Sequence, residues 1–155
     1  GHDETLLKDV LGYLGDLRLS PVVLKRIGGA QQSLFQKFMN WAGDTCFAIV
    51  LLSGDDFGAA RQQYEAPGVG ERCLQYRARQ NVVFELGYFY GRLGWENVFV
   101  VYKPPPKVFP NFEPPSDLLG IVWDEVDESG AWRRSLAERL ANSGFALAEA
   151  AAGPM

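Results

Sequence analysis

Two short runs of consecutive apolar residues constrain the fold of this 155-residue chain more than any other feature. They are Cys46–Leu52 and Val98–Tyr102, each long enough for one strand and too short for a buried helix. Strands that are apolar on both faces are typical of parallel sheets covered by helices on both sides. The sequence therefore predicts an α/β domain with these strands at its centre.

Segments with helical apolar periodicity alternate with the apolar runs. Helices are expected over 4–17, 31–41, 78–93 and 131–141, and further short strands at 21–24 and 121–123. The glycine-containing region 53–75 and the proline-rich region 103–115 are expected to be loops. This order predicts one three-layer domain over residues 1–145, with residues 146–155 as a tail or linker. Such sheets usually begin with a central strand, so we expect the first strand to be absent from this chain.

Charge and composition exclude several classes of function. The net charge of −4 and the pI near 5.0 argue against a general nucleic-acid-binding surface. No apolar run approaches the length of a membrane span and no signal-type segment occurs, which favours a cytoplasmic protein without membrane contact. With a single histidine and two cysteines, the chain predicts no metal site, and its cysteines suit a reducing compartment.

Polar residues that follow the apolar runs are the first candidates for a binding site, because ligands bind outside the carboxyl ends of parallel strands. Ser53, Asp55 and Asp56 follow one strand directly. His2 and Asp3 would lie at the same edge if a strand precedes them. For each of these residues, a turn or a helix cap is the simpler interpretation.

The predicted helix over 78–93 carries a second candidate. Val82, Leu86, Phe89, Tyr90 and Leu93 form its apolar stripe, and Glu85 lies at the border of that stripe. No basic residue stands three or four positions from Glu85, so its carboxylate either pairs with a distant cation or faces a pocket. Arg77 and Arg79, at the start of the helix, could meet phosphates or be solvated.

Three motifs together resemble a known family. Arg79–Phe89, Phe47–Asp56 and Pro115–Ile121 are similar to the bacterial TIR-like family of predicted nucleotide-binding proteins. Members serve as effector domains in cyclic-nucleotide-triggered anti-phage defence, often fused to a STING-like sensor. The opening segment Gly1–Glu4 resembles the part of the family that follows the first strand.

The resemblance implies a flavodoxin-like TIR fold and hydrolysis of NAD+ at the bond between nicotinamide and ribose. NAD+ is then the substrate, and no cofactor is implied. The implied partners are other TIR protomers in a homo-oligomer or filament and a linked cyclic-nucleotide sensor. The family's catalytic glutamate falls on Glu85, its pocket-lining positions on Arg79 and Asp117, and its acidic loop on Ser53, Asp55 and Asp56.

The chemistry suits a site with one carboxylate. Breaking an N-glycosidic bond develops positive charge on the ribose, which an ionised Glu85 can stabilise. Tyr88 or Trp123 could stack on a ring, although both are more simply structural. Two alternatives stay open: a glycosyl transfer like that of nucleoside deoxyribosyltransferases, and a TIR scaffold that only assembles.

Overall fold

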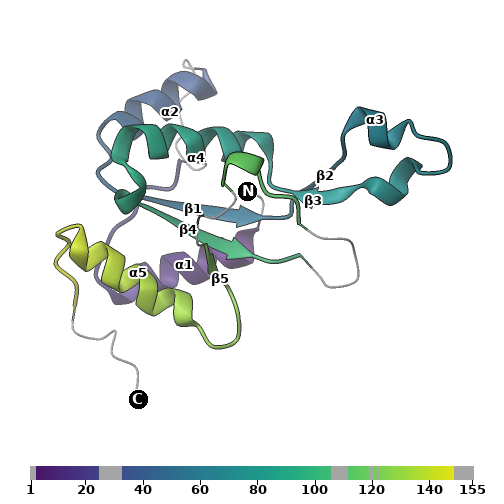
Figure 1. The fold of residues 1–155 in the computed structure, drawn as a ribbon. Coiled ribbons are helices and arrows are strands. Elements are labelled where there is room, and N and C mark those ends of the chain that lie inside the picture. The colour runs from purple at the N-terminus through teal and green to yellow at the C-terminus, as the bar shows by residue number, and fades with distance from the viewer. Residues whose placement is uncertain (1–2, 25–32, 106–111, 119–120, 122, 149–155) are drawn as a thin grey trace.

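The computed structural model describes residues 3–24, 33–105, 112–118, 121 and 123–148 (Figure 1). Its helices are α1 (Glu4–Asp16), α2 (Leu34–Gly43), α3 (Arg61–Tyr64), α4 (Gln80–Leu93) and α5 (Ala131–Asn142). Its strands are β1 (Ala48–Ser53), β2 (Asp56–Gly58), β3 (Gln75–Arg77), β4 (Val98–Lys103) and β5 (Asp124–Glu125). The short 3-10 helices are η2 (Gly70–Cys73), η3 (Trp95–Asn97) and η4 (Ser116–Leu118).

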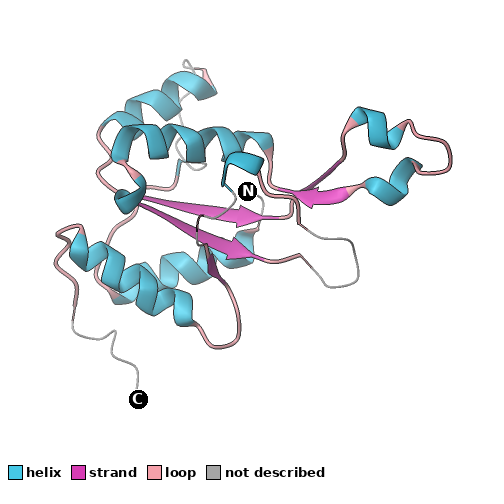
Figure 2. Cartoon of the chain, viewed as in Figure 1, coloured by secondary structure: helices cyan, strands magenta, loops and turns pink. Residues whose placement is uncertain are grey.

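The central sheet is parallel, in the order β1-β4-β5. β1 and β4 pair in register from Ala48 with Val98 to Ser53 with Lys103, so Ser53 and Lys103 end these strands at one edge. Figure 2 shows helices on both faces of this sheet. The predicted α/β architecture is confirmed, and the two apolar runs form the neighbouring strands β1 and β4.

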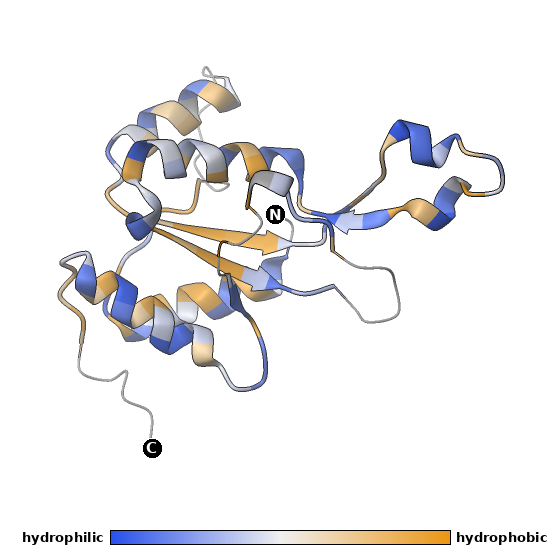
Figure 3. Ribbon diagram, viewed as in Figure 1, coloured by the Kyte–Doolittle hydropathy of each residue, from blue (hydrophilic) through white to orange (hydrophobic). Residues whose placement is uncertain are grey.

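Two apolar cores lie on opposite faces of the sheet, and β4 contributes to both because its side chains alternate between the faces. Val98 and Val100 pack with α2 and α4, whereas Phe99 and Val101 pack with α1 and α5. β1 and β4 are accordingly among the most apolar parts of the ribbon in Figure 3. Phe145 and Leu147 extend the second core beyond α5.

Capping residues determine where the first two helices begin. Asp3 caps α1 by accepting a hydrogen bond from the amide of Leu6. Ser33 and Gln36 form a capping box, in which each side chain bonds to the backbone of the other, so α2 begins at Leu34. Of the helix expected at 31–41, residues 31–32 lie outside the described residues, and the helix that the structure describes runs from Leu34 to Gly43.

The region 53–75, expected to be a loop, contains regular structure. β2 and β3 pair antiparallel, and together with α3 and η2 they form an arm that projects from the three-layer body (Figure 1). The rings of Phe57 and Tyr76 lie 4.5 Å apart across the two strands. Each of these strands has only three residues, too few to show an alternating pattern in the sequence.

Two of the short strands were predicted wrongly. Residues 21–24 form no strand, and Leu24 lies in a 3-10 turn. Ile121 and Trp123 lie in no strand and Val122 lies outside the described residues, whereas the last described strand is Asp124–Glu125, whose Asp124 pairs with Val101 of β4. On α4, Val82, Leu86 and Phe89 are buried as predicted, but Tyr90 and Leu93 are only partly buried.

Candidate functional site

A cavity of about 570 Å³ lies along β1, with α1 and α4 contributing to its lining. Three of the predicted site residues line it: Asp3 at the start of α1, Ser53 at the end of β1, and Glu85 on α4. These residues are far apart in the sequence, and the parallel topology brings them to one cavity. The other predicted residues that the structure describes do not line it.

Glu85 lines the cavity among apolar residues of α4. Val82 and Phe89, one turn away on either side, line the same cavity, and the neighbouring Leu86 is completely buried. The carboxylate forms no ion pair with any residue in the described part of the chain. Burial raises the pKa of Glu85 above its ordinary value, because an apolar surrounding disfavours the charged form. Of the two readings left open by the sequence, the structure supports the one in which Glu85 faces a pocket.

Ser53 is a polar residue that is only 6% exposed. Its hydroxyl donates a hydrogen bond to Asp55 Oδ1 at 3.0 Å, and its carbonyl accepts one from the Asp55 amide at 2.9 Å. The turn after β1 is thus fixed by local hydrogen bonds. Asp56 then begins β2, the first strand of the arm.

Asp3 joins α1 to the carboxyl edge of the sheet. One of its carboxylate oxygens accepts from the amide of Leu6 at 2.8 Å, and the other lies 2.5 Å from Lys103 Nζ. Burial alone would raise the pKa of Asp3, but the hydrogen bond from Leu6 and the ammonium of Lys103 outweigh it and lower the pKa. Lys103 opens one of the segments that follow an apolar run, where the sequence favours ligand binding, but it was not among the predicted site residues.

The arginines before α4 are engaged with carboxylates. Arg79, the residue that precedes α4, has its Nε 3.9 Å from Asp56 Oδ1. Arg77 Nη2 lies 2.5 Å from Glu113 Oε2, a long-range pair that the sequence did not indicate. These two pairs lie at the root of the arm, where β3 meets the body.

The remaining predicted residues lie elsewhere or outside the described residues. Tyr88 packs edge-to-face on Phe38 of α2, with ring centroids 5.0 Å apart. Trp123 packs against Tyr102, and its buried indole N–H has no hydrogen-bond partner among the described residues. His2 lies outside the described residues, and Asp117 lies in η4, where its side chain is not described.

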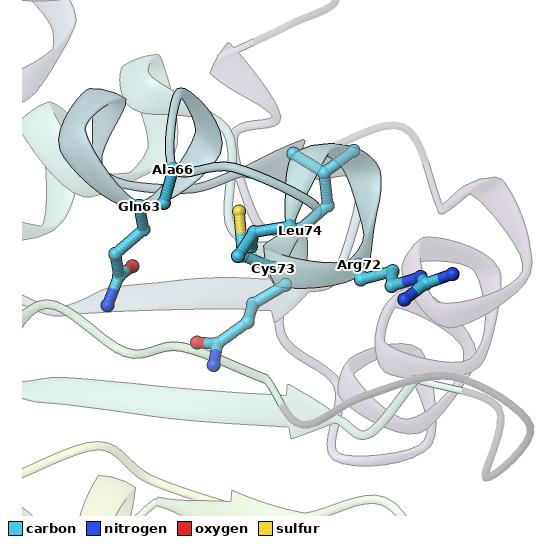
Figure 4. Close-up of a pocket in the computed structure, with 7 residues that line it drawn as sticks. Gln63, Ala66, Arg72, Cys73 and Leu74 are labelled. Carbon is cyan, nitrogen blue, oxygen red and sulfur yellow. The ribbon is translucent and has the colours of Figure 1, made fainter.

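A second cavity, of about 300 Å³, belongs to the arm alone (Figure 4). Gln63, Arg72 and Cys73 are among its lining residues, and none of the predicted site residues lines it. Within the described residues, no group of three or more histidine, cysteine, aspartate or glutamate side chains could hold a metal ion. No helix there is long and apolar enough to cross a membrane. The cavity along β1 is therefore the candidate site.

Comparison with known proteins agrees with this architecture. Residues 1–128 match the family described as CAP12/Pycsar effector protein, TIR domain. The chain is 37% identical over 144 residues to the uncharacterized protein YuaY of Escherichia coli (strain K12), covering 93% of this chain and 44% of YuaY. It is 30% identical over 128 residues to the protein tirC of Dictyostelium discoideum, covering 83% of this chain and 62% of tirC.

Shorter matches are found to two proteins that are both named CD-NTase-associated protein 12. CD-NTase-associated protein 12 of Lachnospiraceae bacterium (strain RUG226) is 34% identical over 77 residues, which are 49% of this chain and 19% of that protein. In each of these comparisons the chain spans less than two thirds of the relative's length. The family match, in contrast, covers most of this chain. The chain belongs to the TIR domain family of the CAP12/Pycsar effector proteins.

Proposed function

We propose that this chain is the effector domain of an anti-phage protein and that it hydrolyses NAD+ at the bond between nicotinamide and ribose. The observation that carries the proposal is Glu85, a half-buried carboxylate that lines a cavity at the sheet and forms no ion pair within the described residues. Membership of an effector family and the resemblance of Arg79–Phe89 to the motif of NAD+-cleaving TIR-like proteins support it.

The chemistry requires little more than a carboxylate in the right place. Nicotinamide leaves from NAD+ as a neutral molecule, so its departure needs no general acid. Positive charge develops on the ribose as the bond breaks, and an ionised Glu85 stabilises that charge. Because the cavity is mainly apolar, water screens this interaction less than at an exposed surface. Water then adds to the ribose and gives ADP-ribose.

Assembly is the second part of the proposal. Two relatives are named as CD-NTase-associated proteins, and this chain spans about a fifth of their length. We propose that a cyclic-nucleotide sensor elsewhere in the full-length protein, or associated with it, brings TIR protomers together and so activates the site. Other TIR protomers and NAD+ are then the partners of this domain.

The test is nicotinamide release from NAD+ by the chain fused to an oligomerising segment. We expect turnover that falls by at least about 100-fold in Glu85→Gln, since the charge opposite the developing positive charge is lost. Glu138→Gln, an exposed glutamate on α5, is the matched control and should keep full activity. Equal turnover in a folded Glu85→Gln variant would remove Glu85 from the mechanism.

Product analysis separates the two alternative functions. A glycosyl transferase would exchange nucleobases on a nucleoside without net release of nicotinamide. A scaffold would assemble without consuming NAD+ and would be indifferent to substitution of Glu85. Release of nicotinamide and ADP-ribose in equal amounts supports the hydrolase.

A further inference from the structure

The root of the arm is a small sheet built from three separate segments of the chain. β2 and β3 pair antiparallel, and Phe112 forms a parallel bridge with Tyr76 of β3. Directly after that bridge, the amide of Glu113 donates a hydrogen bond to the carbonyl of Tyr76 at 2.8 Å. This root lies at the carboxyl end of β1, where the arm leaves the body (Figure 1).

The side chain of Arg77 contacts all three segments of the root. Arg77 is the last residue of β3, and its Nε and Nη2 lie 2.6 Å and 2.5 Å from the same carboxylate oxygen of Glu113. Its side chain also crosses Gly58 of β2, where an added Cβ would be 2.5 Å from Nη1 and 2.8 Å from Cδ of the arginine. The absence of a side chain at Gly58 therefore leaves the space that Arg77 occupies.

A second close contact joins the root to the turn after β1. Tyr76 lies beside Gly54, where an added Cβ would be 3.0 Å from the Cβ of the tyrosine and 3.1 Å from its ring. Gly54 directly follows Ser53, the last residue of β1. The root is thus packed tightly against this turn, so a shift of β3 would also move the turn.

Each segment of the root is continuous with a different group of the predicted site residues. β2 begins with Asp56, directly after the turn of Ser53. β3 leads into α4, which carries Glu85. Glu113 is followed by two prolines and then by η4, and the fixed φ angles of the prolines stiffen this connection. Arg77 lines neither of the two cavities described above, so its contacts are with the chain itself.

We propose that Arg77 is a positioning residue that holds the loop before η4, the start of β2 and the start of α4 in one arrangement at the carboxyl edge of the sheet. The proposal rests on the proposed function, because these segments carry the residues that are expected to bind NAD+. Loss of the pair with Glu113 releases the loop before η4 from the root, whereas Glu85 stays on α4. Binding of the substrate should therefore weaken more than the chemical step slows.

Hydrogen exchange of the free chain tests the positioning without any substrate. Arg77→Met keeps a long side chain beside Gly58 and removes the guanidinium. We expect the amide of Glu113 to exchange at least about tenfold faster in this variant, while the amides of β1 and β4 exchange as in the wild type. Arg61→Met is the matched control, since Arg61 on the arm forms an ion pair with Glu65, only four residues away, and should leave the exchange of Glu113 unchanged.

Nicotinamide release by the oligomerised chain provides the second readout. We expect the KM for NAD+ to rise at least about tenfold in Arg77→Met, with kcat within about threefold of the wild type. A purely structural role would instead lower the fraction of folded protein, which reduces the apparent kcat at an unchanged KM. The double charge reversal Arg77→Glu/Glu113→Arg should recover both the KM and the slow exchange that each single reversal loses.

Four results would overturn the proposal: unchanged exchange of the Glu113 amide in a folded Arg77→Met variant, an equal acceleration throughout β1 and β4, an unchanged KM, or no recovery in the double reversal. Absence of nicotinamide release by the wild type would refute the proposed function instead. The exchange measurements involve no NAD+, so they decide separately whether Arg77 holds these segments together.

Discussion

Replacing Asp3 tests the connection that holds α1 at the carboxyl edge of the sheet. Asp3→Ala removes the N-cap of α1, worth about 1 kcal/mol, and the pair with Lys103, worth about 0.2–1 kcal/mol because the lysine is partly exposed. At about 2–4 °C per kcal/mol for a chain of this size, the unfolding midpoint should fall by about 2–8 °C. Asp3→Asn keeps a good capping side chain and loses only the charge, so its midpoint should fall by about 4 °C at most.

Thermal unfolding followed by circular dichroism measures these shifts, with Lys103→Met as the second single variant. In the double variant Asp3→Asn/Lys103→Met, the two losses should not add, since both remove the same pair. Raising the salt to about 1 M should shrink the effect of Lys103→Met and leave most of the effect of Asp3→Ala. An Asp3→Asn variant as unstable as Asp3→Ala, or additive losses in the double variant, would refute this account of Asp3.

Three further predictions concern other parts of the fold. Glu85→Gln should raise the free energy of unfolding at neutral pH and leave it unchanged near about pH 3. The pKa of Glu85 is raised in the folded state, so ionisation of Glu85 destabilises the folded protein, and this loss disappears when the carboxyl is protonated. A stabilisation that is independent of pH would contradict this prediction. Arg92→Met should lower the free energy of unfolding by about 1 kcal/mol, because Arg92 donates hydrogen bonds to the carbonyls of Ala42 and Gly43 at the end of α2. Arg92→Lys should lower it by less. Urea unfolding measures both variants, and a stability equal to that of the wild type in both would contradict this role of Arg92. Leu136→Ala should lower the free energy of unfolding by about 2–5 kcal/mol, because Leu136 on α5 is completely buried. Glu138→Ala, on the exposed face of the same helix, should lower it by less than about 0.5 kcal/mol. Similar urea midpoints for the two variants would show that α5 is not packed as described.

The parts of the fold that were predictable from the sequence are those with long, regular patterns. β1 and β4 are continuous apolar runs, and α4 and α5 carry apolar stripes over several turns. Such patterns arise because these elements are buried in the sheet or against it. Each pattern lies within one short stretch of sequence and can therefore be recognised there. The arm was not predictable, because its strands are short and its contacts, such as the pair of Arg77 with Glu113, join residues far apart in the sequence.

The prediction of a strand at 21–24 was wrong for a different reason. Its composition is that of a strand, but a strand forms only where a neighbour supplies hydrogen bonds, and none of the described residues does so here. Local propensity therefore could not determine its structure.

The candidate site was predictable in part. The expectation that ligands bind at the carboxyl ends of parallel strands indicated Ser53 and Asp3, and the position of Glu85 at the border of the apolar stripe of α4 indicated Glu85. These three residues line one cavity. Neither signal could indicate that Arg79 lies near Asp56, or that Tyr88 packs against Phe38, since both contacts depend on how separate elements meet. The resemblance placed Glu85, Arg79 and Asp117 in one pocket, next to an acidic loop with Ser53, Asp55 and Asp56. The roles of all the predicted site residues, Glu85 included, remain predictions.

The most direct test of the central claim is the amount of nicotinamide that the oligomerised chain releases from NAD+, measured beside Glu85→Gln and Glu138→Gln. The account predicts release by the wild type and by Glu138→Gln, equal amounts of nicotinamide and ADP-ribose, and at least about 100-fold less release by Glu85→Gln. Equal release by a folded Glu85→Gln variant, or nucleobase exchange in place of hydrolysis, would contradict it.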